Sequence, residues 1–268
     1  MFGWKPVKLG SGDGLRDIEP GTSYQICNTC ECNSCELMYC DIRFHNDDLK
    51  RYYQDYQTEK FFKQREMFEA SFITRRKSFK PGSGIISGLF NSMNLVEEFI
   101  TNNGDYQADS GTILDYGGSL GAGSPFSKSK AKKFVYDLDP RVKNKSNFIQ
   151  KKKFNEHPID LVVLRNVLEH TPYPRKIIRD ITASCKSGTL VYIEVPLERV
   201  MMQHGAGTRN LEKKIWHEHI NFFTSKSIEK MAKANGLNFV SVKEVKMFSD
   251  DASDNDNNRT HLMCLLRT

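Results

Sequence analysis

The stretch that decides the fold is ILDYGGSLGAG, residues 113–123. Its first half is a short apolar run typical of a buried strand, and its second half is rich in glycine. Glycine lacks a Cβ and accepts positive φ, so such a turn lets the backbone approach a ligand closely. We expect a helix after Gly121, with free N–H groups that face the same ligand. The stretch therefore predicts a strand, a ligand-binding turn and a helix.

Outward from this stretch, short apolar segments alternate with helical ones. We predict strands at 111–117, 133–139, 159–166, 189–196, 237–245 and 261–268, and helices at 88–100, 174–185 and 225–235. Strands that alternate with helices form a parallel sheet, and two closing strands without a helix between them form an antiparallel hairpin at its edge. The predicted fold class is therefore α/β. Ser225 is the expected N-cap of the last helix, and Gly236 its stop.

Acidic residues end the first two predicted strands. Asp115 closes the first, and Asp139 closes the second, 24 residues later. Ligands of open α/β sheets bind at the carboxyl ends of the strands, where an acid on the second strand suits two ribose hydroxyls. The dinucleotide fingerprint G-x-G-x-x-G does not fit the glycines at 117, 118, 121 and 123. The pattern thus favours a nucleoside ligand other than a dinucleotide.

The glycine stretch resembles the D-x-G-x-G-x-G motif of class I S-adenosylmethionine (SAM) methyltransferases, with Ser119 in the middle position. IDLVVLRNVLEHTPYP, 159–174, looks like the fourth-strand motif of these enzymes, and VYIEVP, 191–196, like their fifth strand. The segment 144–154, NKSNFIQKKKF, gives no clear third strand. The resemblance implies a Rossmann-like sheet and SAM bound by Asp115, Gly117, Gly118, Gly121, Asp139 and Asn166. We interpret His170, in the Leu-Glu-His triplet, as a structural hydrogen-bonding residue rather than a catalytic one.

The segment IWHEHINFF, 215–223, carries two histidines two residues apart. Zinc proteases use H-E-x-x-H on a helix, so that interpretation fails. In an extended segment, alternate side chains share one side, so His217 and His219 would face the same way. An imidazole accepts a proton at neutral pH. The alternative is that both histidines only brace the segment.

The same segment resembles the Y-H-E-H-x-x-Y-F motif of sugar C-methyltransferases, with Trp216 in place of tyrosine. The resemblance implies that Glu218 and His219 lie near the substrate. We predict that His219 is the general base, and that Glu218 orients it or contacts a sugar hydroxyl. His217 is the third candidate catalytic residue.

Five of the seven cysteines lie in CNTCECNSCELMYC, residues 27–40. Two C-x₂-C pairs indicate a zinc site. The sugar C-methyltransferases carry an N-terminal zinc module, which this segment resembles. We predict a structural zinc ion held by Cys27, Cys30, Cys32 and Cys35, with Cys40 as the substitute ligand. The alternative is a remnant module with free thiols.

Composition narrows the function classes. The chain has 268 residues, of which 38% are hydrophobic, with 17 Phe and 10 Tyr, enough for a core. A membrane-spanning helix needs about 20 consecutive apolar residues, and no such run or secretory signal is present, so we expect a cytoplasmic protein. The net charge is +6, with lysine runs at 127–134 and 150–154 that we interpret as a solvated face rather than an RNA-binding patch.

These observations divide the chain into a Cys-rich module at 1–45 that we expect to bind zinc, a helical linker or lid region at 46–104 and a SAM-binding methyltransferase domain at 105–268. The expected function is SAM-dependent methyl transfer to a small-molecule acceptor: a sugar, a nucleotide sugar or a glycoconjugate precursor in carbohydrate biosynthesis. The alternatives are an RNA or protein methyltransferase and a non-catalytic SAM-fold binding protein. A measurement of SAM binding is the cheapest way to separate the methyltransferases from the non-catalytic binding protein.

Overall fold

A computed structural model of the chain describes residues 29–41, 47, 53, 58–66, 84–119, 124–197, 219–248 and 258–268. The predicted roles of Cys27, Gly121, His217 and Glu218 lie outside the described residues. The other predicted site residues are within them.

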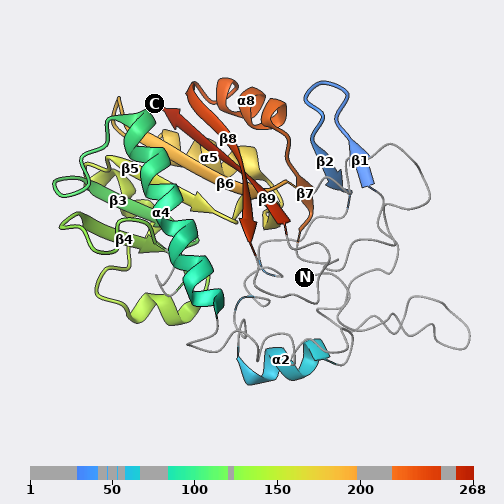
Figure 1. Cartoon of the computed structure of the whole chain (residues 1–268), viewed down its shortest axis with the longest axis horizontal. Coiled ribbons are helices and arrows are strands. Elements are labelled where there is room, and N and C mark those ends of the chain that lie inside the picture. Colours follow the sequence, from blue (N-terminus) through green and yellow to red (C-terminus); the bar gives the residue numbers. More distant parts are fainter. Residues whose placement is uncertain are drawn as a thin grey trace, which may run out of the picture.

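A six-stranded sheet forms the centre of the described structure (Figure 1). Its order is β4-β3-β5-β6-β9-β8. The strands are β3 (Thr112–Tyr116), β4 (Lys132–Tyr136), β5 (Leu161–Arg165), β6 (Leu190–Pro196), β8 (Asn238–Phe248) and β9 (Asn258–Arg267). The first four in this spatial order are parallel, and β9 pairs antiparallel with both β6 and β8. The predicted α/β sheet with a closing antiparallel hairpin is confirmed.

The segment 144–154, which has no clear strand pattern, forms a single isolated β-bridge and no strand. Between β4 and β5 lie two short 3-10 helices, η1 (Pro140–Asn144) and η2 (Lys151–Glu156). An isolated parallel bridge joins Val135 to Phe148 between them. The lysine-rich flanks leave too few apolar residues for a longer buried strand. Ile149 and Phe154 are nevertheless buried in the core.

Helices cover both faces of the sheet. On one face, α4 (Gly84–Gly104) packs Val96, Phe99 and Ile100 into a cluster with β3, β5 and β6. On the other, α5 (Pro174–Thr182) and α8 (Ser225–Lys233) bury isoleucines against the same strands. Figure 1 shows α4 crossing one face of the sheet. Within the described ranges, none of the helices is long and apolar enough to span a membrane.

Helix boundaries differ from the predictions, and α5 and α8 each end a few residues early, at Thr182 and Lys233. The helix predicted at 88–100 begins earlier, at Gly84, and ends at Gly104. The helix predicted after Gly121 is wrong for the described residues 124–131, which form turns and bends. Only ten residues separate Gly121 from β4, so a full helix and two loops do not fit. Thr224, not Ser225, caps α8, because its hydroxyl accepts the Ser227 N–H at 3.1 Å.

The cysteine-rich segment forms part of a second, three-stranded sheet. A hairpin of β1 (Thr29–Glu31) and β2 (Met38–Cys40) pairs through β2 with β7 (Asn221–Phe222). The backbone N–H of Cys40 also donates to the Ile220 carbonyl at 2.9 Å. The short helix α2 (Glu59–Glu66) belongs to the predicted helical region. The hairpin is therefore held directly beside the segment that carries His219.

Candidate active site

The glycine turn after β3 has no room for a Cβ atom at Gly117 or Gly118. At Gly117 φ is +77°, and a Cβ there would lie 2.6 Å from Val167. A Cβ on Gly118 would lie 2.4 Å from the carboxylate of Asp115. Asp115 is itself buried at the end of β3, and this burial raises its pKa to about 6. The turn thus lies tightly over the strand end, with its backbone available to a ligand.

A second carboxylate holds this turn from the neighbouring strand. Asp137 follows β4 directly, and its Oδ2 accepts the backbone N–H of Ser119 at 2.7 Å. Its Oδ1 accepts the N–H of Asp139 at 2.8 Å. Burial raises the pKa of Asp137, although these N–H donors oppose the rise. The sequence interpretation missed Asp137, and its place directly after the apolar strand was the available signal.

Asp139 lies two residues after Asp137, and its carboxylate is bonded within the chain, to Arg141. Its carboxylate is 1% exposed and accepts the Arg141 backbone N–H at 2.9 Å. The Arg141 Nε lies 3.0 Å from each of its oxygens. Burial alone would raise the pKa of Asp139, but the hydrogen bonds from Arg141 hold it below its usual value. Much of the hydrogen-bonding capacity of Asp139 is therefore used within the chain.

One cavity unites the ends of β3, β4 and β5. Its walls include Gly117, Ser119, Asp137, Asp139 and Asn166, together with Leu138, Val167 and His170. Asn166 follows β5 with a positive φ of 52°, and its N–H donates to the Glu194 carbonyl at 2.9 Å. Leu138 exposes 40% of its surface there, an apolar wall beside the acids. Three of the six predicted cofactor residues, Gly117, Asp139 and Asn166, thus line one pocket.

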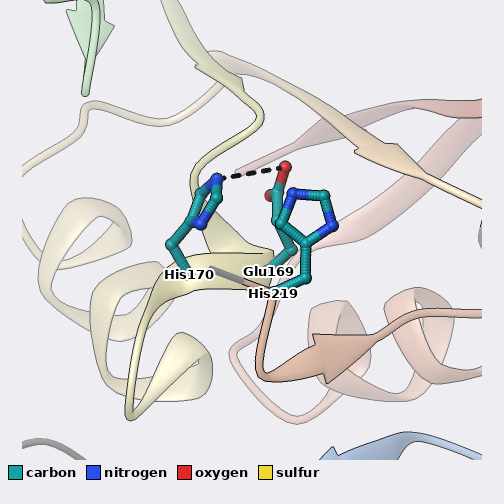
Figure 2. Close-up of side chains that lie close together, drawn as sticks. All are labelled: Glu169, His170 and His219. Atoms are coloured by element: carbon teal, nitrogen blue, oxygen red, sulfur yellow. Dashed lines mark ion pairs between the residues drawn. The ribbon is translucent and has the colours of Figure 1, made fainter. Parts of the chain in front are cut away.

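A cluster of Glu169, His170 and His219 adjoins this cavity (Figure 2). The two imidazole rings are 4.8 Å apart between centroids and inclined at 74°. His170 Nε2 lies 3.8 Å from Glu169 Oε1, and the Glu169 carboxylate is almost fully buried. Sequence reasoning predicted His219 but not its neighbours: Glu169 had no assigned role, and His170 had only a structural one. We call this group the Glu-His-His cluster.

The two segments that form the Glu-His-His cluster are held together by a clamp. The Ile220 N–H donates to the Glu169 carbonyl at 2.8 Å. The buried Asn221 side chain donates to the carbonyls of Leu168 and Thr171 at 2.9 and 2.7 Å. Glu169 and His219 are 50 positions apart, and no local pattern predicts this pairing. The clamp fixes the backbone on both sides of the cluster.

The cysteine hairpin turns at 32–37. The Cys32 N–H donates to the Leu37 carbonyl at 2.9 Å, and Glu36 has a positive φ of 62°. Hydrogen bonds from Cys35 and Ser34 lower the pKa of Cys32, whereas burial raises that of Cys35. The described cysteines of the hairpin are all half-buried, and Cys30, Cys32 and Cys35 are not in disulfides. The turn therefore brings two of the predicted zinc ligands together.

A buried ion network lies at the carboxyl ends of β5 and β6. Glu194 is fully buried and accepts Arg165 Nε at 2.8 Å and Tyr192 Oη at 2.9 Å. His261 Nδ1 lies 3.1 Å from the same carboxylate. Burial would raise the pKa of Glu194, but the His261 and Arg165 contacts lower it to about 2. This network joins β5, β6 and β9 behind the site and was not predicted from the sequence.

Comparisons with known proteins agree with this architecture. Residues 91–242, more than half of the chain, match the model of a family described as a methyltransferase domain. A search of curated proteins finds no match. The family match runs from within α4 to within β8, so it includes β3, β4, β5 and β6 and the Glu-His-His cluster.

Three solved structures are similar at low identity. A SAM-dependent methyltransferase from Archaeoglobus fulgidus is 11% identical, with 74% of this chain and 100% of that chain covered and a TM-score of 0.45. One from Mesorhizobium loti is 10% identical, with 68% and 98% covered and a TM-score of 0.45. One from Clostridium acetobutylicum is 12% identical, with 65% and 89% covered and a TM-score of 0.44. The family match is therefore the more informative of these findings.

Proposed function

This chain belongs to the methyltransferase-domain family and is a SAM-dependent methyltransferase, and we propose that its acceptor is a sugar, a nucleotide sugar or a glycoconjugate precursor. The observation that carries the proposal is the pairing of a SAM-type cavity with the adjoining Glu-His-His cluster. The His-Glu-His motif of sugar C-methyltransferases, of which His219 is the last residue, supports a sugar-type acceptor.

The cavity fits SAM on three features of the chain. The side-chain-free turn at Gly117 and Gly118 leaves its backbone open to a ligand. The Asp137 carboxylate, already bonded to that turn, suits the ribose hydroxyls, and Leu138 suits the adenine ring. SAM supplies an activated methyl group on a sulfonium. We therefore propose Asp115, Gly117, Gly118, Gly121, Asp137, Asp139 and Asn166 as the SAM-binding residues.

We propose His219 as the group that removes a proton from the acceptor. A hydroxyl or carbon acceptor must lose a proton when it takes the methyl group, and the glycine turn holds no group that accepts one. His219 is half-buried beside His170, and the Glu169 carboxylate belongs to the same cluster. Glu218 stays the residue proposed to orient the base or to contact a sugar hydroxyl, and His217 stays the third candidate catalytic residue.

Substitution of Asp137 tests the cavity. We expect Asp137→Asn to weaken SAM binding about 10- to 100-fold, because hydrogen bonds to a charged group contribute roughly 1.5–3 kcal/mol. Asp139→Asn should weaken it less, since Arg141 occupies that carboxylate. Titration calorimetry measures both, with the exposed Asp109→Asn as the control and NAD as the competing ligand. Tight NAD binding, or no SAM binding by folded wild type, would reject the proposed function.

The cysteine hairpin is proposed to hold one structural zinc ion through Cys27, Cys30, Cys32 and Cys35, with Cys40 as the substitute. Four thiolates leave no open position, so the metal would stabilise rather than react. Zinc binding at the hairpin would also affect the candidate active site, because β2 of the hairpin pairs with β7 next to His219. Zinc would thus stabilise the strand that positions the proposed base.

We expect Cys32→Ser to lower the zinc content by about one equivalent and to reduce turnover, while SAM affinity stays close to that of wild type. The control is Cys185→Ser, a half-buried thiol outside the hairpin. Metal analysis after purification without added zinc gives the content. Less than about one-tenth equivalent in the reduced wild type would favour a remnant module with free thiols.

A further inference from the structure

We propose that the Glu-His-His cluster binds a divalent first-row transition-metal ion that holds the oxygen of the methyl acceptor. The proposal rests on the proposed function for the role of the metal, and on the cluster alone for its binding. It changes how His219 supports proton removal, from direct proton acceptor to metal ligand.

The ligand set and spacing suit such an ion. Glu169, His170 and His219 offer one oxygen and two nitrogens within 4.8 Å of one another. Ligands bonded at about 2.0–2.1 Å to one ion lie roughly 3–4 Å apart, so small side-chain rotations complete the site. Among the described residues, these three form the one group of three or more His, Cys, Asp or Glu residues placed to share an ion. Three protein ligands leave positions open, as in catalytic rather than structural sites.

The backbone around the cluster is fixed before any ion binds. The Ile220 N–H and the Asn221 side chain bond the strand after His219 to the carbonyls on both sides of His170. The strand is bonded on its other edge by β2 of the cysteine hairpin. A metal site needs its ligands within about 0.5 Å of the required geometry, which such support provides. A cluster assembled by chance on loops would lack this double support.

The position of the cluster gives the ion a role in the reaction. His170 lines the SAM-type cavity. It also belongs to the cluster, beside Glu169 and His219 (Figure 2). An acceptor hydroxyl held at the cluster would therefore face the methyl donor. A bound cation lowers the pKa of a coordinated oxygen, as zinc lowers the pKa of its bound water to about 7.

Methyl transfer from SAM to the acceptor oxygen needs no oxidant or reductant. The acceptor O–H bond breaks, and its proton leaves to solvent. An oxygen lone pair forms the new bond to the methyl carbon, while the carbon–sulfur bond breaks and its electron pair stays on sulfur. The products are the methyl ether and S-adenosylhomocysteine, and the ion keeps its charge.

Manganese titration of the full chain tests the site. Mn²⁺ prefers carboxylate and other oxygen ligands to thiolates, so the cysteine hairpin competes little. After treatment with a chelator, electron paramagnetic resonance measures unbound Mn²⁺ as metal is added. We expect one equivalent bound by wild type, and at least about tenfold weaker binding by His219→Ala and by the near-isosteric Glu169→Gln. His157→Ala, a histidine stacked on Phe134 away from the cluster, should bind like wild type.

SAM titration of the same samples shows whether each variant is folded and separates the two proposals. Metal binding that weakens in the cluster variants, with SAM binding retained, supports the site. No Mn²⁺ binding below about 1 mM by a wild type that binds SAM overturns the metal site and leaves the methyltransferase assignment. Equal Mn²⁺ binding by wild type and both cluster variants also overturns it. A chain that binds Mn²⁺ at the cluster but not SAM supports the metal site and rejects the proposed cavity.

Discussion

Replacement of His219 by alanine is expected to lower kcat by about 10²- to 10⁴-fold, the usual contribution of a positioned general base. The affinity for SAM should stay close to that of wild type, because His219 adjoins the proposed SAM cavity and is not among its lining residues. A base that acts only in the chemical step changes kcat without changing cofactor binding. The same loss is expected if His219 acts as a metal ligand.

The measurement is release of S-adenosylhomocysteine with a nucleotide-linked deoxysugar that the wild type methylates. His157→Ala is the control for loss of an imidazole elsewhere in the chain. Added Mn²⁺ after chelation distinguishes the two roles of His219: metal should restore the turnover of the wild type only if the cluster binds it. Near wild-type turnover by His219→Ala would show that proton removal occurs elsewhere, with His170 as the next candidate.

Arg165→Met is expected to cost about 3–5 kcal/mol of unfolding free energy. The change leaves Glu194, which is fully buried, without its guanidinium partner at 2.8 Å. In a chain of this size the loss corresponds to roughly 10 °C in Tm. The double variant Arg165→Met/Glu194→Gln should recover part of the stability, because no uncompensated charge is then buried.

Lys176→Met is the matched control for Arg165→Met, because it breaks another pair with a 2.8 Å contact, to Asp180. That lysine is exposed, so the expected cost is within about 1 kcal/mol. Urea unfolding measures all three variants. Equal losses in the buried and exposed pairs would contradict the importance of burial.

The same network makes the free energy of unfolding depend on pH in the acid range. The folded chain holds the pKa of Glu194 at about 2, below the ordinary 4.5. A depressed carboxyl pKa contributes stability that is present above pH 4.5 and is lost as the pH falls through about 2. The difference between wild type and Arg165→Met should therefore narrow over this window. Unfolding midpoints at neutral pH and at about pH 3 measure it.

Local patterns in the sequence were enough to predict the sheet. Short apolar runs predicted all six strands of the large sheet. The inner strands β3, β5, β6 and β9 are the most continuous of these runs, because both of their faces are buried. The glycine turn and the stop at Gly236 were also predicted, since positive φ at Gly117 and Gly236 is a property of the local backbone. The acid at the end of the second strand was predicted only as Asp139.

Tertiary contacts decided the composition of the site. Asp137 and Asp139 are two residues apart with the same chemistry, and only the fold shows that Arg141 engages one while the glycine turn donates to the other. Glu169 and His219 meet because the Asn221 side chain and the Ile220 N–H bond across 50 positions of chain. Such contacts depend on burial and hydrogen-bond partners from distant segments, which no local periodicity encodes. The same reason explains why the cysteine hairpin was predicted as a separate module, although it pairs with the strand beside His219.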